Sequence, residues 1–197
     1  LCAASTKVTL VRDGDKVLVM RYPARRFGKN IILEIDVAFP IVHGTNVEDG
    51  ALQGYLKTLG VPFVGCDVTA SAIGMDKYVM KSVLESEGFP VLKCLRLNRR
   101  RDKIADCIKK IEEAIPYPVI IKPVNLGSSV GISKAADRDS LEAALSEAFG
   151  YAECVLAERA IVKLREINCS VVGDSTKAEA SECEEPFMHD EILSYSD

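Results

Sequence analysis

The chain has 197 residues, of which 48% are apolar and 27% are charged, and its formal net charge is -4 at pH 7. These values are typical of a soluble globular protein with one large or two small domains. The acidic balance and the lack of a basic stripe argue against a nucleic-acid partner, and no apolar run is long enough to span a bilayer.

Hydrophobic periodicity and turn residues predict an irregular alternation of strands and helices. In chain order these are strands over 6–11, 16–20 and 36–42, a helix over 49–59, a strand over 61–64, helices over 76–87 and 103–115, strands over 119–122 and 130–134, a helix over 139–149, and strands over 155–158 and 166–172. The acidic tail from Lys177 has no clear periodicity. Mixed elements of this kind indicate α/β and α+β layers.

The ends of several elements are marked by residues with a known preference. Asp76 is the expected N-cap of the second helix. Asp139 followed by Glu142 resembles a capping box at the start of the fourth helix. Pro40 lies inside the strand predicted over 36–42, and proline restricts that strand to a sheet edge or a strand end.

Lys122 ends an apolar run, and a loop rich in glycine and serine follows it over 125–131. Glycine lets a backbone approach a ligand closely, and successive N–H groups with the hydroxyls of Ser128 and Ser129 suit polyphosphate oxygens. A Walker A loop would need a Gly-Lys-Ser/Thr run that opens a helix, whereas the residues after Gly131 predict a strand. We therefore interpret the loop as a hairpin lid over phosphates, and a plain surface hairpin is the alternative.

His43 and Glu48 lie in the segment 43–50, between a predicted strand and a predicted helix. Ligands bind at such junctions in α/β folds, so we interpret the two residues as contacts to a polar substrate that carries an amine. The alternatives are structural. Glu48 and Asp49 can complement the helix dipole from a first helical turn, and His43 can hydrogen-bond to backbone at a strand end.

Three further charged residues are candidates for nucleotide contacts. Lys77 follows the cap Asp76 in a first helical turn, where a cation costs roughly 0.3–1 kcal/mol unless an anion also binds there. Glu158 ends one predicted strand and Glu166 begins the next. Such carboxylates can accept hydrogen bonds from an adenine amino group and from ribose hydroxyls. For all three residues the alternative is ordinary solvated charge.

The seven cysteines are odd in number, are scattered along the chain and form no C-x-x-C pair. This pattern indicates reduced cytosolic thiols rather than a disulfide framework or a zinc site. The two histidines, His43 and His189, are too few to suggest a histidine-based metal site.

Together the motifs resemble the D-alanine–D-alanine ligase family of ATP-grasp enzymes, from about residue 35 onward. The resemblance is carried by 43–50 (HGTNVEDG), 71–77 (SAIGMDK), 121–133 (IKPVNLGSSVGIS), Glu158, 165–166 (RE), 183–186 (CEEP) and 190–195 (DEILSY). The segment 64–67 (VGCD) is similar to the vancomycin-resistance branch, which couples D-alanine to D-serine or D-lactate. Val47 stands where the family usually has glycine.

The resemblance implies that ATP phosphorylates the carboxylate of one D-alanine. A second D-alanine, D-serine or D-lactate then attacks the acyl phosphate, which gives a peptidoglycan precursor for the cell wall. The implied ATP-binding residues are Lys77, Lys122, Ser128, Ser129, Glu158 and Glu166, and the implied catalytic residues are His43, Glu48 and Ser128. The lysines would hold phosphates, Glu158 the adenine and Glu166 the ribose, while His43 and Glu48 would lie near the first D-alanine.

The resemblance also implies domains and partners. We expect a remnant of the N-terminal substrate domain over 1–67, a small ATP-grasp domain over 68–157 and the start of a large ATP-grasp domain over 158–197. The family is longer at both ends, so we expect a truncated chain whose magnesium ligands belong to a missing C-terminal part. We further expect small-molecule substrates, a cytoplasmic homodimer, and no nucleic-acid or membrane partner. The alternatives are another ATP-grasp carboxylate–amine ligase and an inactive nucleotide-binding fragment.

Overall fold

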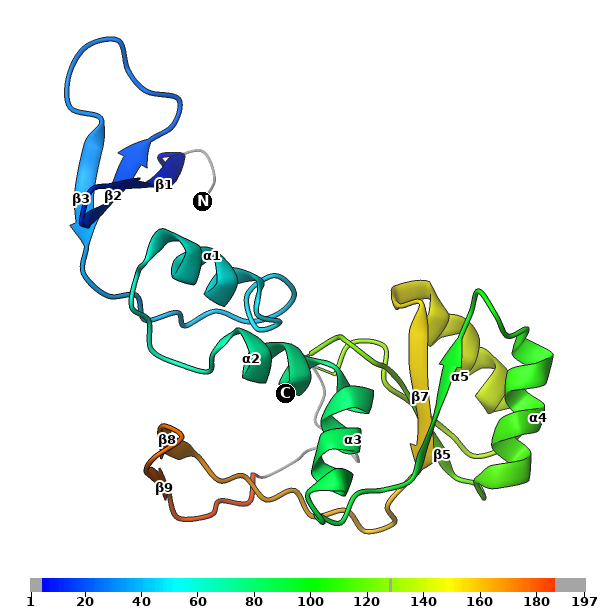
Figure 1. Ribbon diagram of the computed structural model, residues 1–197. Helices are drawn as coiled ribbons and strands as arrows, with labels where there is room; N and C mark the ends of the chain where they lie inside the picture. Colours follow the sequence, from blue (N-terminus) through cyan, green and yellow to red (C-terminus); the bar gives the residue numbers. More distant parts are fainter. Residues whose placement is uncertain (1–4, 128, 187–197) are drawn as a thin grey trace. The chain divides into compact units, whose positions relative to one another are not determined.

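The computed structural model describes residues 5–127 and 129–186, and it divides into an N-terminal unit, residues 1–83, and a C-terminal unit, residues 84–197 (Figure 1). Each unit has its own cluster of buried apolar side chains. Both units mix helices with antiparallel strands, in agreement with the predicted class of α/β and α+β layers. No helix among the described residues is long and apolar enough to cross a membrane.

The N-terminal unit begins with an antiparallel sheet in the order β1-β2-β3. Its strands are β1 (Val8–Asp13), β2 (Lys16–Arg21) and β3 (Ile31–Ile35). The predicted hairpin of β1 and β2 is confirmed, and Gly14 occupies its turn with a φ of 58°. We did not predict β3, because three apolar residues stand side by side at its start and give no alternating pattern.

The helices of this unit are α1 (Ala51–Leu59), α2 (Val68–Met75) and α3 (Lys77–Ser86), which continues into the C-terminal unit. α1 begins two residues later than predicted because Gly50, with a φ of 93°, is its N-cap. Asp76 is confirmed as a cap, since its carboxylate accepts from the backbone N–H groups of Tyr78 and Val79, both at 3.0 Å. α2 was not predicted because its small residues form no apolar stripe.

Two predicted strands of the N-terminal unit are reduced to one bridge. Ala38 pairs in parallel with Phe63, and no longer ladder forms at this point among the described residues. The strands predicted over 36–42 and 61–64 are therefore wrong in length. Each segment contains a proline, and a proline nitrogen cannot donate the hydrogen bond that would extend the ladder.

The C-terminal unit is built on a four-stranded antiparallel sheet in the order β4-β7-β5-β6. Its strands are β4 (Cys94–Asn98), β5 (Val119–Pro123), β6 (Ser133–Ala135) and β7 (Cys154–Arg159). Two helices, α4 (Ile104–Ala114) and α5 (Arg138–Tyr151), lie on one side of the sheet (Figure 1). They bury one continuous core against it, whose fully buried members include Ile111, Ile121, Leu141 and Leu145.

Several strand predictions in the C-terminal unit need correction. The strand predicted over 130–134 is wrong at its start, because turns occupy that part and β6 begins at Ser133. β4 was missed, although its alternation of leucine with polar residues was a readable strand signal. Helix α4 is confirmed within one residue of the predicted start and end.

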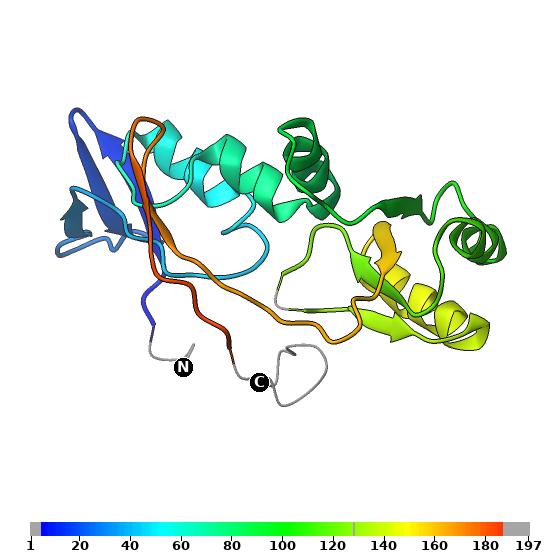
Figure 2. The ribbon, with the colours of Figure 1, turned by 90° about the horizontal axis from the view of Figure 1, so that it is seen from below.

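A long exposed hairpin follows β7. Its two arms run side by side toward β8 (Val171–Gly173) and β9 (Ala178–Ala180), drawn in orange and red in Figure 2. The strand predicted over 166–172 is wrong for most of its length, because only Asn168 and the start of β8 pair there. β9 lies in the tail that showed no periodicity. Both strands are exposed throughout, so no buried side chain marks them in the sequence.

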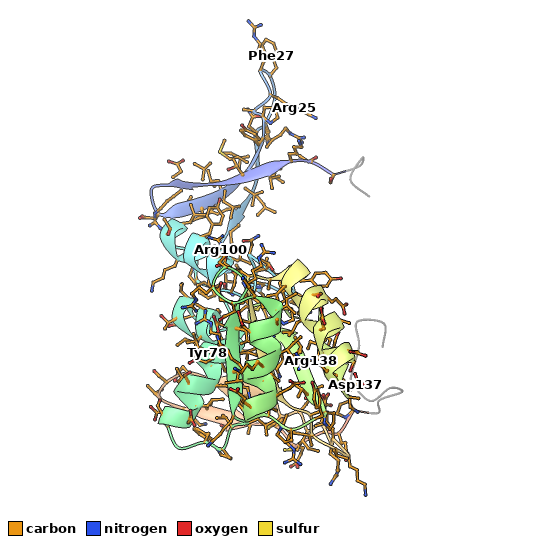
Figure 3. The ribbon with its side chains drawn as sticks, turned by 90° about the vertical axis from the view of Figure 1, so that its right-hand side faces the viewer. Arg25, Phe27, Tyr78, Arg100, Asp137 and Arg138 are labelled. Carbon is orange, nitrogen blue, oxygen red and sulfur yellow. The ribbon has the colours of Figure 1, made fainter. Side chains whose placement is uncertain are left out.

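The N-terminus of α5 is capped by a residue that we did not predict. Asp137, labelled in Figure 3, precedes the first residue of α5. Its carboxylate accepts from the backbone N–H of Ser140 at 2.9 Å, and the Ser140 hydroxyl accepts from the Asp137 N–H at 3.1 Å. The predicted box of Asp139 and Glu142 is therefore wrong by two residues. Serine at the third helical position closes the box where the sequence pattern looks for Glu or Gln.

This cap gives a pH-dependent prediction. Asp137→Ala should lower the melting temperature because it removes the hydrogen bonds from Ser140, whereas the control Asp139→Ala should change it little. Those same bonds lower the pKa of Asp137, so their stabilisation is present above the unfolded pKa and is lost as the pH falls through the folded pKa. The difference between wild type and Asp137→Ala should therefore shrink below about pH 4, measured by thermal denaturation. An equal loss in the Asp139 variant would contradict the assignment.

Candidate functional site

Lys122 and Glu158 lie on the neighbouring strands β5 and β7. In their antiparallel register, Ile120 stands opposite Glu158 and Lys122 opposite Leu156. Opposite residues of a ladder, and alternate residues of a strand, point to the same side of a sheet. Because Ile121 belongs to the core beneath the helices, Lys122 and Glu158 share the face opposite α4 and α5.

The two side chains form an ion pair on this face. Lys122 Nζ donates a hydrogen bond to Glu158 Oε1, and the side chains are 18% and 7% exposed, respectively. Among the described residues, the ammonium group of Lys122 has no hydrogen-bond partner besides Glu158. An ammonium group has three N–H donors, so two remain for the oxygens of an anion. With little solvent around it, this cation interacts strongly with any anion brought to the same face.

The loop after β5 begins two residues beyond Lys122 and contains turns at 124–125 and 129–131. Val130 N donates to Gly127 O at 3.2 Å, and both Ser129 and Gly131 have a positive φ, at 56° and 70°. This backbone is unlike an extended strand, and it leaves a compact turn next to the Lys122 strand. Ser128, which we predicted to act in catalysis and ATP binding, lies outside the described residues.

Gly131 is a position in this loop where a side chain cannot be added without strain. A Cβ there would lie 2.8 Å from Tyr151 Cδ2 and 3.0 Å from Pro123 Cγ. Gly131→Ala should therefore lower the free energy of unfolding by about 1–3 kcal/mol.

The matched control for this prediction is Gly150→Ala, in α5. A Cβ at that position meets nothing within 4 Å, so the change should stabilise the protein by about 0.5–1 kcal/mol. Urea denaturation of the two variants measures both effects. Equal shifts, or a stabilised Gly131 variant, would show that the loop conformation does not depend on glycine.

His43 and Glu48 come together in the loop before α1. His43 Nδ1 lies 3.4 Å from Glu48 Oε1, and Glu48 Oε2 accepts from Gly44 N at 2.5 Å. The imidazole is 80% exposed, so it can reach a ligand, while the carboxylate is held by the loop backbone. The structure thus brings these two predicted residues together and leaves the histidine facing solvent.

The alternative that Glu48 and Asp49 occupy a first helical turn is wrong. α1 has no acidic residue in its first turn, since both carboxylates precede it. Asp49 instead accepts from Asn46 N at 2.7 Å and from Ala51 N at 3.1 Å, and these bonds lower its pKa. The acidic pair therefore shapes the loop that presents His43.

Gln53 is a supporting residue of this loop that sequence reasoning missed. It lies in α1 and is 9% exposed, and its Nε2 donates to Val47 O at 3.0 Å. Val47 is the position that departs from the family pattern. A glutamine in a helix normally indicates a solvent-facing position, so the sequence carries no signal for this buried contact.

The remaining predicted residues lie elsewhere. Lys77 opens α3 and is half-buried, and it belongs to the N-terminal unit, whereas Lys122 and Glu158 belong to the C-terminal unit. Glu166 is half-buried in the first arm of the exposed hairpin, outside any strand. Within residues 5–127 and 129–186, no group of three or more His, Cys, Asp or Glu side chains could hold a metal ion.

Family models match most of the chain. The one described as D-ala D-ala ligase C-terminus matches residues 83–197, and the one described as D-ala D-ala ligase N-terminus matches residues 12–66. The boundary between these matches falls close to the division of the structure after residue 83.

Curated relatives and solved structures agree with these matches. The chain is 46% identical over 164 residues to D-alanine--D-alanine ligase A of Chromobacterium violaceum, covering 83% of this chain and 44% of that protein. It is 42% identical over 168 residues to the D-alanine--D-alanine ligase of Ruminiclostridium cellulolyticum, covering 82% and 44%. The chain thus spans less than half the length of these relatives.

Two solved structures share the fold. The VanG D-Ala:D-Ser ligase of Enterococcus faecalis has a TM-score of 0.80 at 31% identity, over 96% of this chain and 52% of that one. The D-alanine-D-alanine ligase of Coxiella burnetii has a TM-score of 0.75 at 31% identity, over 93% and 51%. The predicted resemblance is therefore confirmed at the level of fold.

Proposed function

Because the chain belongs to the D-alanine–D-alanine ligase family, we propose that it forms part of an ATP-dependent enzyme that joins D-alanine to a second D-amino acid or to D-lactate. The observation that carries this proposal is the ion pair of Lys122 and Glu158 on the face of the C-terminal sheet opposite α4 and α5. A half-buried cation with two donors left, next to a glycine- and serine-containing turn, suits a nucleoside triphosphate.

In the proposed reaction, a carboxylate oxygen of the first D-alanine attacks the γ-phosphorus of ATP, which gives an acyl phosphate and ADP. The amine or hydroxyl of the second substrate then attacks the acyl carbon and releases phosphate. Neither step needs a covalent bond to the protein, so catalysis consists of positioning and charge neutralisation. Water must also be excluded, because it would hydrolyse the acyl phosphate.

Lys122 has the clearest role in this scheme. We propose that its ammonium group, with that of Lys77, holds phosphate oxygens, while Glu158 accepts from the adenine amino group and Glu166 from the ribose. Glu158 already contacts Lys122, so nucleotide binding must share the ammonium group or draw it away from the carboxylate. The ion pair keeps the lysine extended on the sheet face before ATP arrives.

The substrate side of the scheme rests on the loop before α1. We propose that His43 and Glu48 lie near the first D-alanine, with Glu48 orienting the exposed imidazole through their 3.4 Å contact. Ser128 and Ser129 would close over the transferred phosphate. The domain limits at residues 67 and 157, a magnesium ion bound with ATP, a homodimer and a cytoplasmic location remain predictions. For magnesium we assign no ligands to this chain.

Analysis of the reaction products identifies the second substrate, for which we propose a candidate class. The segment 64–67 favours D-serine or D-lactate over D-alanine as the acceptor, in line with its similarity to the vancomycin-resistance branch. In the experiment, a protein of full family length that contains these 197 residues is incubated with ATP and D-alanine. Each acceptor is then added in a separate reaction. We expect phosphate release that depends on D-alanine, together with one dipeptide or depsipeptide, and no reaction with L-alanine. Phosphate release without a ligated product, or with L-alanine, would contradict the proposal.

A further inference from the structure

The exposed hairpin after β7 brings two cysteines face to face. Asn168 and Glu184 exchange both backbone hydrogen bonds, with N···O distances of 2.8 and 2.9 Å. They are therefore a hydrogen-bonded pair of an antiparallel ladder, and the next position toward the tip is a non-hydrogen-bonded pair. That position holds Cys169 on one arm and Cys183 on the other.

The spacing at this position fits a disulfide. In a regular ladder, the Cα atoms of a non-hydrogen-bonded pair lie about 4.5 Å apart. Disulfides bridge Cα atoms about 4.4–6.8 Å apart, so a pair with the regular ladder spacing falls at the short end of the allowed range. Glu182 is an extra residue on its arm, because the register changes by one between this position and β8–β9, and such a bulge gives the arm room to adjust.

The two thiols already interact. A hydrogen bond between them raises the pKa of Cys183, and Cys169 Sγ also donates to Ser181 O at 3.4 Å. Both cysteines are exposed, so a small oxidant can reach them. The arms are held from the open end by Arg165, which binds Glu185 through two hydrogen bonds of 2.9 and 2.7 Å. The two cysteines therefore lie between the contact of Cys169 with Ser181 toward the tip and the Arg165–Glu185 ion pair toward the open end.

The other described cysteines lack this arrangement. Cys107 is fully buried in the core. Cys94 and Cys154 lie on neighbouring strands, but Cys94 stands opposite Glu158 and Cys154 opposite Asn98. Cys66 is exposed and has no cysteine opposite it in any strand pairing of the described residues. Although the cysteines are spread along the sequence, the fold therefore brings Cys169 and Cys183 together as a pair.

We propose that Cys169 and Cys183 form a reversible redox site that closes the hairpin with a disulfide when an external disulfide such as oxidised glutathione is present. The thiolate of Cys169 attacks the external disulfide, forms a mixed disulfide and releases one glutathione thiolate. The Cys183 thiolate then attacks the Cys169 sulfur, forms the internal disulfide and releases the second glutathione. Two protein thiols lose their hydrogens and one external disulfide is reduced to two thiols, so atoms and electrons balance. Exposed disulfides of this kind are readily reduced again.

Trypsin makes the test direct, because it separates the two cysteines. Cleavage after Arg165 and Lys177 places Cys169 in the peptide 166–177 and Cys183 in the peptide that begins at residue 178. The 197-residue chain is equilibrated with oxidised glutathione, alkylated, digested and analysed by mass spectrometry. We expect the linked pair of these peptides to be the main disulfide, at least about tenfold above any other cysteine pair. Reduced glutathione should remove it.

Variants distinguish the pair from general thiol reactivity. Cys169→Ser should abolish the linked peptide and leave Cys183 as a mixed disulfide with glutathione, whereas the control Cys66→Ser should keep the link. Closing the hairpin should also slow amide hydrogen exchange over 168–184 by at least about tenfold in the oxidised wild type. Glutathione on Cys169 and Cys183 separately, without the internal link, would overturn the proposal. A link that involves Cys66 equally well would do the same. These outcomes are independent of the proposed ligase activity.

Discussion

Replacing Lys122 with methionine is expected to lower kcat/KM for ATP by roughly 100- to 1,000-fold in a protein of full family length that contains these residues. Methionine keeps much of the volume of the side chain but carries no N–H donor. The ammonium group would otherwise neutralise charge on the phosphate during transfer, from a site where its side chain is only 18% exposed. Steady-state kinetics of phosphate release with D-alanine measures the effect.

The same substitution also tests the ion pair as a structural element. Lys122→Met leaves the buried Glu158 carboxylate without this ammonium group, which should lower the free energy of unfolding by about 3 kcal/mol. The double variant Lys122→Met with Glu158→Gln removes both charges and should recover most of that stability.

Recovered stability without recovered activity separates the two roles of Lys122. The matched control is Lys109→Met on α4, whose side chain is 77% exposed, and it should leave both quantities nearly unchanged. If Lys122→Met kept normal kinetics, the proposed phosphate contact would be wrong. If the double variant recovered activity along with stability, the role of Lys122 would be structural.

Replacing Ile111 with alanine is expected to lower the free energy of unfolding by about 2–5 kcal/mol. Ile111 is fully buried in α4 and belongs to the cluster that joins both helices to the C-terminal sheet. Removing three methyl or methylene carbons from a close-packed core costs their transfer free energy and that of the cavity left behind.

The control for this prediction lies one half-turn away on the same helix. Glu113→Ala removes an exposed side chain whose contact with Lys109 is 3.9 Å long, so the change should be within about 0.5 kcal/mol. Chemical denaturation of both variants measures the difference. Similar stabilities of the two variants would show that α4 does not pack on the sheet by this face.

Helices α1, α3, α4 and α5 were predictable from the sequence because their apolar residues repeat with the helical period, whereas α2 has no such repeat and was not. Ile108 and Ile111 recur on the side of α4 that meets the sheet, and Asp76 marks the start of α3. Strands were predictable where they form apolar, buried runs, as in β5, where alternate residues are buried, and β7, where four consecutive residues are buried. They were not predictable in the exposed hairpin, because β8 and β9 bury no side chains and no buried face therefore requires an alternation of apolar and polar residues in their sequences.

The sequence allowed us to predict which residues belong to the candidate site, but not how their side chains contact one another. Lys122 and Glu158 were both singled out from their own strand ends, yet their contact depends on the register between β5 and β7, which pairs segments 36 residues apart. Local patterns contain no information about that register. The facing thiols of Cys169 and Cys183 were missed for the same reason, since the two residues are 14 positions apart in the sequence.

Oxygen-18 in the carboxylate of D-alanine provides the most direct measurement of the proposed function. A protein of full family length that contains this chain is supplied with labelled D-alanine, ATP and the preferred acceptor, and the released phosphate is analysed by mass spectrometry. If the carboxylate is phosphorylated and then displaced, each phosphate carries one labelled oxygen from D-alanine, because the bridging oxygen of the acyl phosphate leaves with it. Released phosphate without label would show that ATP is hydrolysed by water and would contradict the acyl-phosphate mechanism.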